Sequence, residues 1–171
     1  MDPRYPIGTS EEALAKPLDY ETARAEIAAF PQRLRERLRA LTDQQLRAQY
    51  RPGSWNVRQL VHHCADSHMH ALLRTKRALT EPEARIHGYL QAPTATLPDY
   101  TLPVEPSLLI LDGVHAHFAA LLAALTSEQC DRGYFHAENQ RAYRIPEIAA
   151  LYAWHGRHHL AHIELALRET K

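Results

Sequence analysis

The sequence has few cysteines and no excess of charge of either sign. Its two cysteines, Cys64 and Cys130, do not form a C-x-x-C pair, so a disulfide framework is not indicated and a reducing cytosol fits the composition. Twenty Lys and Arg residues balance 20 Asp and Glu residues, which gives a formal net charge of zero. A nucleic-acid partner usually requires a basic surface, so this balance argues against one.

Segments that would direct the chain to a membrane are also lacking. The first six residues are polar, and no basic region followed by an apolar stretch is present, so the start of the chain does not resemble a signal peptide. No continuous apolar run approaches the roughly 20 residues that span a bilayer. We therefore expect a cytoplasmic protein without a membrane partner. Its length of 171 residues predicts one domain over residues 1–171.

Four segments have the three-and-four spacing of apolar residues that is typical of amphipathic helices. The predicted helices cover residues 20–41, 54–80, 107–125 and 146–168. Pro31 should kink or break the first of them, and Ser54 or Asn56 can cap the second. Residues 1–18 are expected to form an extended arm, and residues 130–145 either a short hairpin or a loop.

Residues 81–106 contain five prolines and form a long irregular connection, which would let the second and third helices run in the same direction. Four long helices in one small domain are best closed as a four-helix bundle. We therefore predict an all-α fold with a long crossover between helices two and three. A weak internal repeat accompanies it, because the pattern Leu-Thr…Gln…Tyr occurs at residues 41–50 and again at residues 125–134.

Histidine is concentrated in two segments that are about ninety residues apart, and eight of the twelve histidines lie there. The segments contain His62, His63, His68 and His70 in the second helix and His155, His158, His159 and His162 in the fourth. Imidazole is a good ligand for zinc, nickel, copper and iron, and two histidines at positions i and i+4 of a helix can share one ion. The pattern therefore suggests a metal site between two distant helices.

The apolar pattern of the fourth helix indicates which of its histidines face the core. The inner seam consists of Ile148, Leu151, His155, His158, His162 and Leu165. His159 lies beside this seam. His158 and His162 have the i,i+4 spacing and lie in the middle of the seam, so we predict this pair as ligands. A second apolar line contains Ala149, Ala153, Gly156, Leu160, Ile163 and Leu167. It indicates burial between layers or a subunit contact, and we favour a homodimer.

The second helix is less informative about its ligand. His63 lies off the best apolar line together with His62 and His70, whereas His68 extends that line, so the pattern alone does not select His63. For every one of these histidines the alternative to a metal is a structural role, in which the buried ring pairs with a backbone carbonyl or a carboxylate. The Asp66 carboxylate could orient a ligand histidine by a hydrogen bond to its ring, without binding the metal itself.

Three stretches resemble the DinB/YfiT-like family of metal-binding bundles, and in particular its YfiT branch. They are Tyr5–Gly8, Trp55–Met69 and Tyr152–Ile163. The resemblance implies an up-down-down-up bundle, frequent dimers, and activity as a metal-dependent hydrolase. It also implies one divalent metal per subunit, zinc first and nickel as the alternative, on one histidine of the second helix and two of the fourth. Carried over to this sequence, the metal ligands are His63, His158 and His162, and His63 rests on the resemblance alone.

A divalent metal on three neutral histidines keeps an open position, as in catalytic zinc sites. A water bound there could attack a small-molecule substrate, which would make the protein a hydrolase. The same position could hold the thiolate of a low-molecular-weight thiol, because some branches of the family are thiol S-transferases that use bacillithiol or mycothiol. A metal-binding bundle without catalysis is the third alternative. The catalytic residues are unknown, and Asp66 and His155 are the nearest candidates for a general base.

Overall fold

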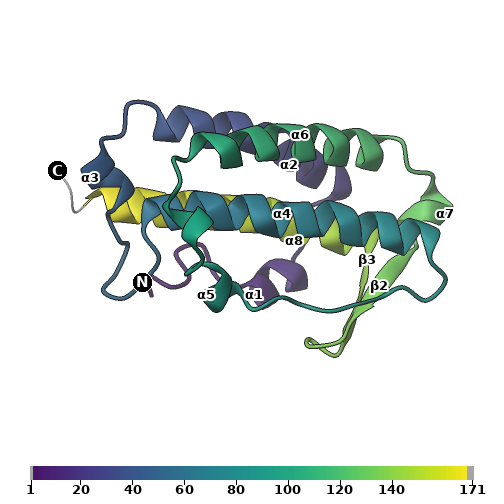
Figure 1. The fold of residues 1–171 in the computed structure, drawn as a ribbon. Helices are drawn as coiled ribbons and strands as arrows, with labels where there is room; N and C mark the ends of the chain where they lie inside the picture. Colours follow the sequence, from purple (N-terminus) through teal and green to yellow (C-terminus); the bar gives the residue numbers. More distant parts are fainter. Residues whose placement is uncertain (1, 169–171) are drawn as a thin grey trace.

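Four long helices form the body of the computed structural model, which describes residues 2–168 (Figure 1). They are α2 (Tyr20–Leu38), α4 (Val57–Thr80), α6 (Glu105–Ala123) and α8 (Ile145–Arg168). Because α2 and α4 each pack mainly against α6 and α8, they occupy opposite corners of the bundle. The predicted four-helix bundle is confirmed, and the up-down-down-up order of its helices stays a prediction.

Short helices fill the connections. They are α1 (Ser10–Ala15), α3 (Asp43–Leu46), α5 (Gln91–Thr94), the 3-10 helix η1 (Pro98–Thr101) and α7 (Ser127–Cys130). The prediction of an extended arm over residues 1–18 was wrong for α1, because Thr9 and Glu12 form a capping box that starts a helix there. The long connection over residues 81–106 holds α5 and η1, as well as one strand.

A three-stranded sheet lies at one end of the bundle. Its strands are β1 (Arg85–Ile86), β2 (Gly133–His136) and β3 (Arg141–Arg144), where β1 pairs in parallel with β2 and β2 pairs antiparallel with β3. Gly133 is required at its position, because a Cβ there would lie 2.0 Å from the carbonyl oxygen of Tyr143. Of the two alternatives for residues 130–145, a hairpin or a loop, the antiparallel pairing of β2 and β3 shows the hairpin. The all-α class holds for the bundle and misses the sheet, since strands of two and four residues are too short for a clear alternation of apolar and polar residues.

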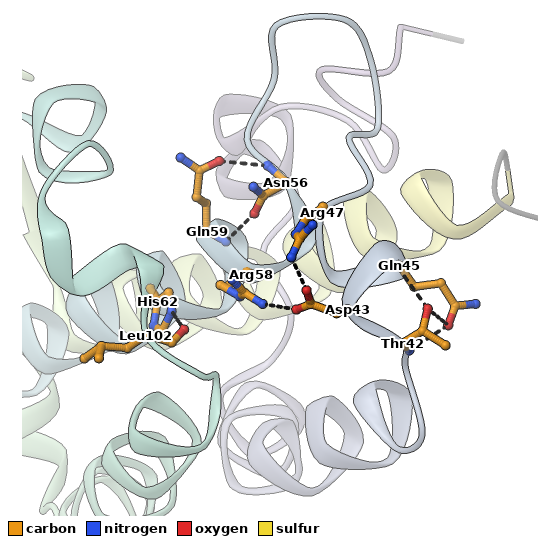
Figure 2. Close-up of polar contacts among 9 residues, drawn as sticks. All are labelled: Thr42, Asp43, Gln45, Arg47, Asn56, Arg58, Gln59, His62 and Leu102. Carbon is orange, nitrogen blue, oxygen red and sulfur yellow. Dashed lines mark hydrogen bonds and ion pairs between the residues drawn. The ribbon is translucent and has the colours of Figure 1, made fainter.

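A capping box sets the start of α4 (Figure 2). Asn56 accepts a hydrogen bond from the Gln59 N–H at 2.9 Å, and the Gln59 side chain accepts one from the Asn56 N–H at 3.0 Å. Asn56, rather than Ser54, therefore caps this helix. Arg58 then donates to the Asp43 carboxylate, which ties the first turn of α4 to α3.

The two copies of the internal repeat adopt the same local structure. Thr42 and Gln45 form a capping box at α3, and Thr126 and Gln129 form one at α7. Each box satisfies two N–H groups at a helix start that would otherwise have no partner. The repeated pattern therefore corresponds to two helical turns, one after α2 and one after α6.

The core explains two further features of the helices. α2 continues through the buried Pro31, so of the predicted kink or break the break does not occur, and the kink stays a prediction. The second apolar line of α8 is largely buried inside the single chain: Ala149, Ala153, Gly156, Ile163 and Leu167. This burial accounts for the line without a second subunit, and the homodimer remains a prediction.

Helix α6 is long and apolar enough to span a membrane by length and composition, and it is the one helix within residues 2–168 that meets both criteria. We expected no such segment because the sequence has no long continuous apolar run, whereas α6 meets a criterion that averages hydropathy over 18 residues. Core helices of soluble proteins meet it as well. One side of α6 is buried in the bundle, with Leu111, Phe118 and Leu122 almost fully covered.

Candidate metal centre

The two histidine-rich segments meet where α4 packs against α8. Nε2 of His63 lies 3.3 Å from Nε2 of His155, and Nε2 of His159 lies 3.2 Å from the same atom. One ligand nitrogen of each of the three residues lies within 4.8 Å of the others. Three imidazole rings from two helices therefore converge on one point.

The spacing and the chemistry of this group fit a transition metal. Zinc–nitrogen bonds of 2.0–2.1 Å at tetrahedral angles place two ligating nitrogens about 3.3 Å apart, close to the two Nε2 distances at His155. The group contains no carboxylate. Nitrogen donors alone suit zinc, nickel, copper or iron, whereas magnesium and calcium prefer oxygen ligands.

Burial keeps the three rings neutral. The His63 side chain is 1% exposed and that of His159 is 6% exposed. Loss of solvation lowers the pKa of His63 to about 4, and it lowers the pKa values of His155 and His159 well below their ordinary value. A metal binds the unprotonated nitrogen of imidazole, so these rings need not lose a proton to bind one near neutral pH.

The three predicted ligands do not form one group. His158 and His162 belong to a second group, in which the third member is His159, and neither group of the described residues joins His63 to His158 or His162. His162 Nδ1 lies 3.3 Å from His159 Nδ1, so His162 contacts the outer nitrogen of a ring whose inner nitrogen faces His155. The assignment of His158 and His162 as ligands stays a prediction.

His155 and His159 are the residues that join His63, and the sequence analysis did not select them as a pair. His159 was placed beside the inner seam, and His155 was placed on the seam but considered as a candidate base and not as a ligand. The available signal was their i,i+4 spacing, which is the same as that of His158 and His162. His158 itself stacks on Trp154 with ring centroids 4.4 Å apart, and its buried Nδ1 has no hydrogen-bond partner among residues 2–168.

Other candidates from the sequence have structural partners. His62 Nε2 donates to the Leu102 carbonyl oxygen at 3.1 Å (Figure 2), and its Nδ1 lies 2.7 Å from Ser107 Oγ. His62 therefore holds the chain before α6 against α4. Asp66 accepts a 2.6 Å hydrogen bond from the Tyr100 hydroxyl, which anchors η1 and occupies this candidate base.

A pocket of about 490 Å³ opens beside His155. It lies between α4, α8, the loop before α5, and the hairpin of β2 and β3, and its lining includes Ser67, Arg74, Tyr89, Tyr134, His136 and Tyr152. The volume falls in the usual range for small-molecule sites. One side of the three-histidine group therefore faces a cavity that can admit a small substrate.

This architecture is shared with known proteins. A family model described as the DinB superfamily matches residues 26–163. A protein of Halalkalibacterium halodurans named "Putative metal-dependent hydrolase" is 42% identical over 172 residues, which covers 100% of both chains. A protein of the same name from Geobacillus thermodenitrificans is 40% identical over 174 residues, covering 100% of this chain and 97% of its own.

A solved structure is similar over almost the whole chain. YfiT from Bacillus subtilis superposes with a TM-score of 0.88 at 35% identity, over 99% of each chain. It is described as "a probable metal-dependent hydrolase with an unusual four-helix bundle topology". The similarity therefore covers both histidine-rich helices and the connections between them.

Proposed function

Since this chain belongs to the DinB superfamily, we propose that it is a metal-dependent hydrolase with one divalent ion on His63, His155 and His159. The observation that carries the proposal is the convergence of three Nε2 atoms at the spacing of metal ligands, next to a pocket. The names of the relatives support metal dependence and hydrolysis as a class. The ligand set is supported by the geometry of this chain.

The positions of the residues around the site suit a hydrolase. Three neutral ligands would leave a divalent ion its full charge and an open position, and the chemistry that such an ion would supply is activation of water near neutral pH. His63 and His159 are buried and close one side of the site. His155 lines the pocket, so a substrate in the pocket would approach the site from this side. The Tyr89 hydroxyl, 3.3 Å from His63 Nδ1, holds that ring in place.

The ligand set is tested by metal content. Single alanine replacements of His63, His155 and His159 should each abolish stoichiometric metal in purified, folded protein, as measured by elemental analysis. His158→Ala is the matched control from the same helix, and it should retain the metal. Loss of the metal in His158→Ala, with retention in His155→Ala or His159→Ala, would reject this set in favour of His63, His158 and His162. The same measurement identifies the ion, for which we propose zinc, with nickel as the alternative.

The reaction is tested by an activity screen of the metal-loaded protein. We expect products from small esters, amides or lactones that require the metal and water alone. Product formation that requires bacillithiol or mycothiol, with matching thiol consumption, would replace hydrolysis by thiol transfer at the same site. Absence of both reactions would favour a metal-binding protein without catalysis. A homodimer and a cytoplasmic location remain predictions, which light scattering and cell fractionation test.

A further inference from the structure

Arg74 brings an uncompensated positive charge to the pocket beside His155. It lies on α4, is partly buried, and lines the pocket. Its Nη2 donates to the His87 carbonyl oxygen at 2.7 Å. Within residues 2–168, Arg74 forms no ion pair with a carboxylate, whereas Arg77, three residues further on, pairs with Glu81. A guanidinium has five N–H donors, so most of those of Arg74 remain available.

The acidic residue of the same pocket already has partners. The Glu138 carboxylate accepts a hydrogen bond from the Gly88 N–H at 2.7 Å and lies 3.2 Å from His136 Nδ1 and 3.4 Å from His87 Nδ1. Among the described residues, the pocket therefore contains one carboxylate that already has hydrogen-bonding partners and one guanidinium that no carboxylate pairs. A neutral ligand would cover the guanidinium without pairing it, which is costly.

We propose that the substrate carries an anionic group, a carboxylate or a phosphate, which Arg74 binds while the reacting group lies at the three-histidine site. This rests on the proposed function and adds the class of substrate. Tyr89, Tyr134 and Tyr152 line the same pocket, and their hydroxyl groups can donate further hydrogen bonds to an anion.

Two matched metal-binding probes test the anion site. The monohydroxamate of succinic acid and butyrohydroxamate differ in that a carboxylate replaces a methyl group at the far end. Calorimetry on the zinc-loaded protein should show the carboxylate probe binding about tenfold tighter or more, which is the gain of a charge-assisted hydrogen bond. Arg74→Met should remove this preference and Arg74→Lys should keep part of it. Lys76→Met, an exposed cation outside the pocket on the same helix, should leave it unchanged.

The outcomes separate this inference from the proposed function. Equal binding of the two probes to the zinc-loaded protein, or a preference that survives in Arg74→Met, would overturn the anion site and leave the metal site standing. Failure of both probes to bind would overturn it too. If elemental analysis then also finds no zinc after loading, the proposed function fails with it.

A second inference comes from the outer nitrogens of the ligand rings, which are held by two chains of hydrogen bonds. In the longer chain, His155 Nδ1 lies 3.0 Å from His68 Nε2, and His68 Nδ1 lies 2.7 Å from His115 Nε2. His115 Nδ1 lies 2.6 Å from the Ile27 carbonyl oxygen, where the chain ends. All of these contacts lie among the four helices, because Ile27 is on α2 and His115 is on α6.

The Ile27 carbonyl group determines which ring nitrogen carries the proton in each histidine of this hydrogen-bond series. A carbonyl oxygen only accepts, so His115 Nδ1 must carry the proton, and its neutral ring then accepts at Nε2. Burial supports the neutral form by lowering the pKa of His115 to about 4. His68 therefore donates from Nδ1 and accepts at Nε2, and His155 donates from Nδ1. The Nε2 of His155 is left as a lone pair that faces His63 and His159.

The shorter chain has the same consequence for His159. His162 Nε2 lies 3.3 Å from the Arg4 carbonyl oxygen, so it carries the proton of that ring. His162 Nδ1 is then an acceptor, and it lies 3.3 Å from His159 Nδ1. His159 donates from Nδ1 and keeps a lone pair on Nε2. Both ligand rings on α8 thus reach backbone carbonyls through other histidines.

We infer that His68, His115 and His162 are positioning residues, which fix the tautomers of His155 and His159 so that both Nε2 atoms are ready to bind metal. Partners behind a ligating histidine fix its tautomer and ring orientation, and their loss typically weakens metal binding by 10–100-fold. This gives His162, a predicted ligand, a different role at the same site. It also explains why two fully buried histidines lie on α4 and α6 without touching the pocket.

The tautomer can be measured without metal, by ¹⁵N–¹H NMR of the histidine rings in the metal-free protein. We expect His155 to be protonated at Nδ1 in the unmodified chain. His115→Leu removes the acceptor of His68 Nδ1, so His68 can carry its proton on Nε2 and donate to His155 Nδ1 instead. The proton of the His155 ring then moves from Nδ1 to Nε2 of His155. The zinc dissociation constant should rise by 10–100-fold. His117→Leu, an exposed position on the same helix, is the control and should change neither quantity.

His115→Gln tests the inference if the leucine variant does not fold. Its amide can donate to the Ile27 carbonyl and accept from His68, so it should preserve the tautomer and most of the zinc affinity. The inference is overturned if His155 carries its proton on Nε2 in the unmodified, metal-free protein. A zinc dissociation constant for folded His115→Leu within twofold of the unmodified value would also overturn it.

Discussion

The metal-free protein should lose stability steeply in mild acid, and His115 provides the clearest measure of this loss. Its side chain is 2% exposed, and burial lowers its pKa to about 4 from the ordinary 6.5. The groups around it are the His68 ring, the Ile27 carbonyl and the Phe30 ring. Asp112, three residues earlier, is paired with Arg35 and only partly opposes the effect of burial.

The sign follows from which state binds the proton. Below pH 6.5 the unfolded chain protonates this histidine, whereas the folded chain does not do so until about pH 4. The free energy of unfolding therefore falls as the pH drops through this window. At 1.36 kcal/mol per pH unit, His115 contributes a loss of about 2 kcal/mol at pH 5 and about 3 kcal/mol at pH 4. A typical domain has only about 5–15 kcal/mol in total.

Urea unfolding of the metal-free protein at several pH values between 7.5 and 5 measures this loss. The unmodified chain should lose about 2 kcal/mol more over this range than His115→Leu, which has no group to titrate at that position. His117→Leu is the matched control, because that side chain is exposed on the same helix and should leave the pH dependence unchanged. Equal slopes for the unmodified chain and His115→Leu would refute the reasoning.

Two glycines in long helices should respond in opposite ways to the same change. A Cβ on Gly156 would lie 2.7 Å from Cδ2 of the buried Phe30 ring, so Gly156→Ala should destabilise by about 1–3 kcal/mol in chemical denaturation. Unchanged or higher stability would show that the ring moves aside at no cost. In the described part of the chain, no atom beyond the adjacent residues and the nearby backbone of α6 lies within 4 Å of a Cβ on Gly113, so Gly113→Ala should stabilise by about 0.5–1 kcal/mol through helix propensity alone. A loss of stability there would contradict this account.

Features that depend on near neighbours in the chain could be predicted from the sequence. The periodic apolar residues located all four long helices, and Asn56 was among the two predicted caps of α4. Of the kink or break predicted at Pro31, the break does not occur, because packing in the bundle holds α2 together across this residue. The strand β1 was missed, since its two residues pair with β2, which lies nearly fifty residues away.

The sequence by itself determined that two helices carry the histidines and that His155, His158 and His162 of the later helix face the interior. At 100° per residue, the four histidines of α8 lie within an arc of about 100°, and two pairs of them have the i,i+4 spacing. Apolar periodicity only shows which side of a helix is buried, and this side is about as wide as the arc, so it cannot distinguish between the two pairs. Only the rotation and height of α4 against α8 place His63 beside His155 and His159. The same packing brings His68 and His115 behind His155, because contacts between helices depend on positions that no local pattern encodes.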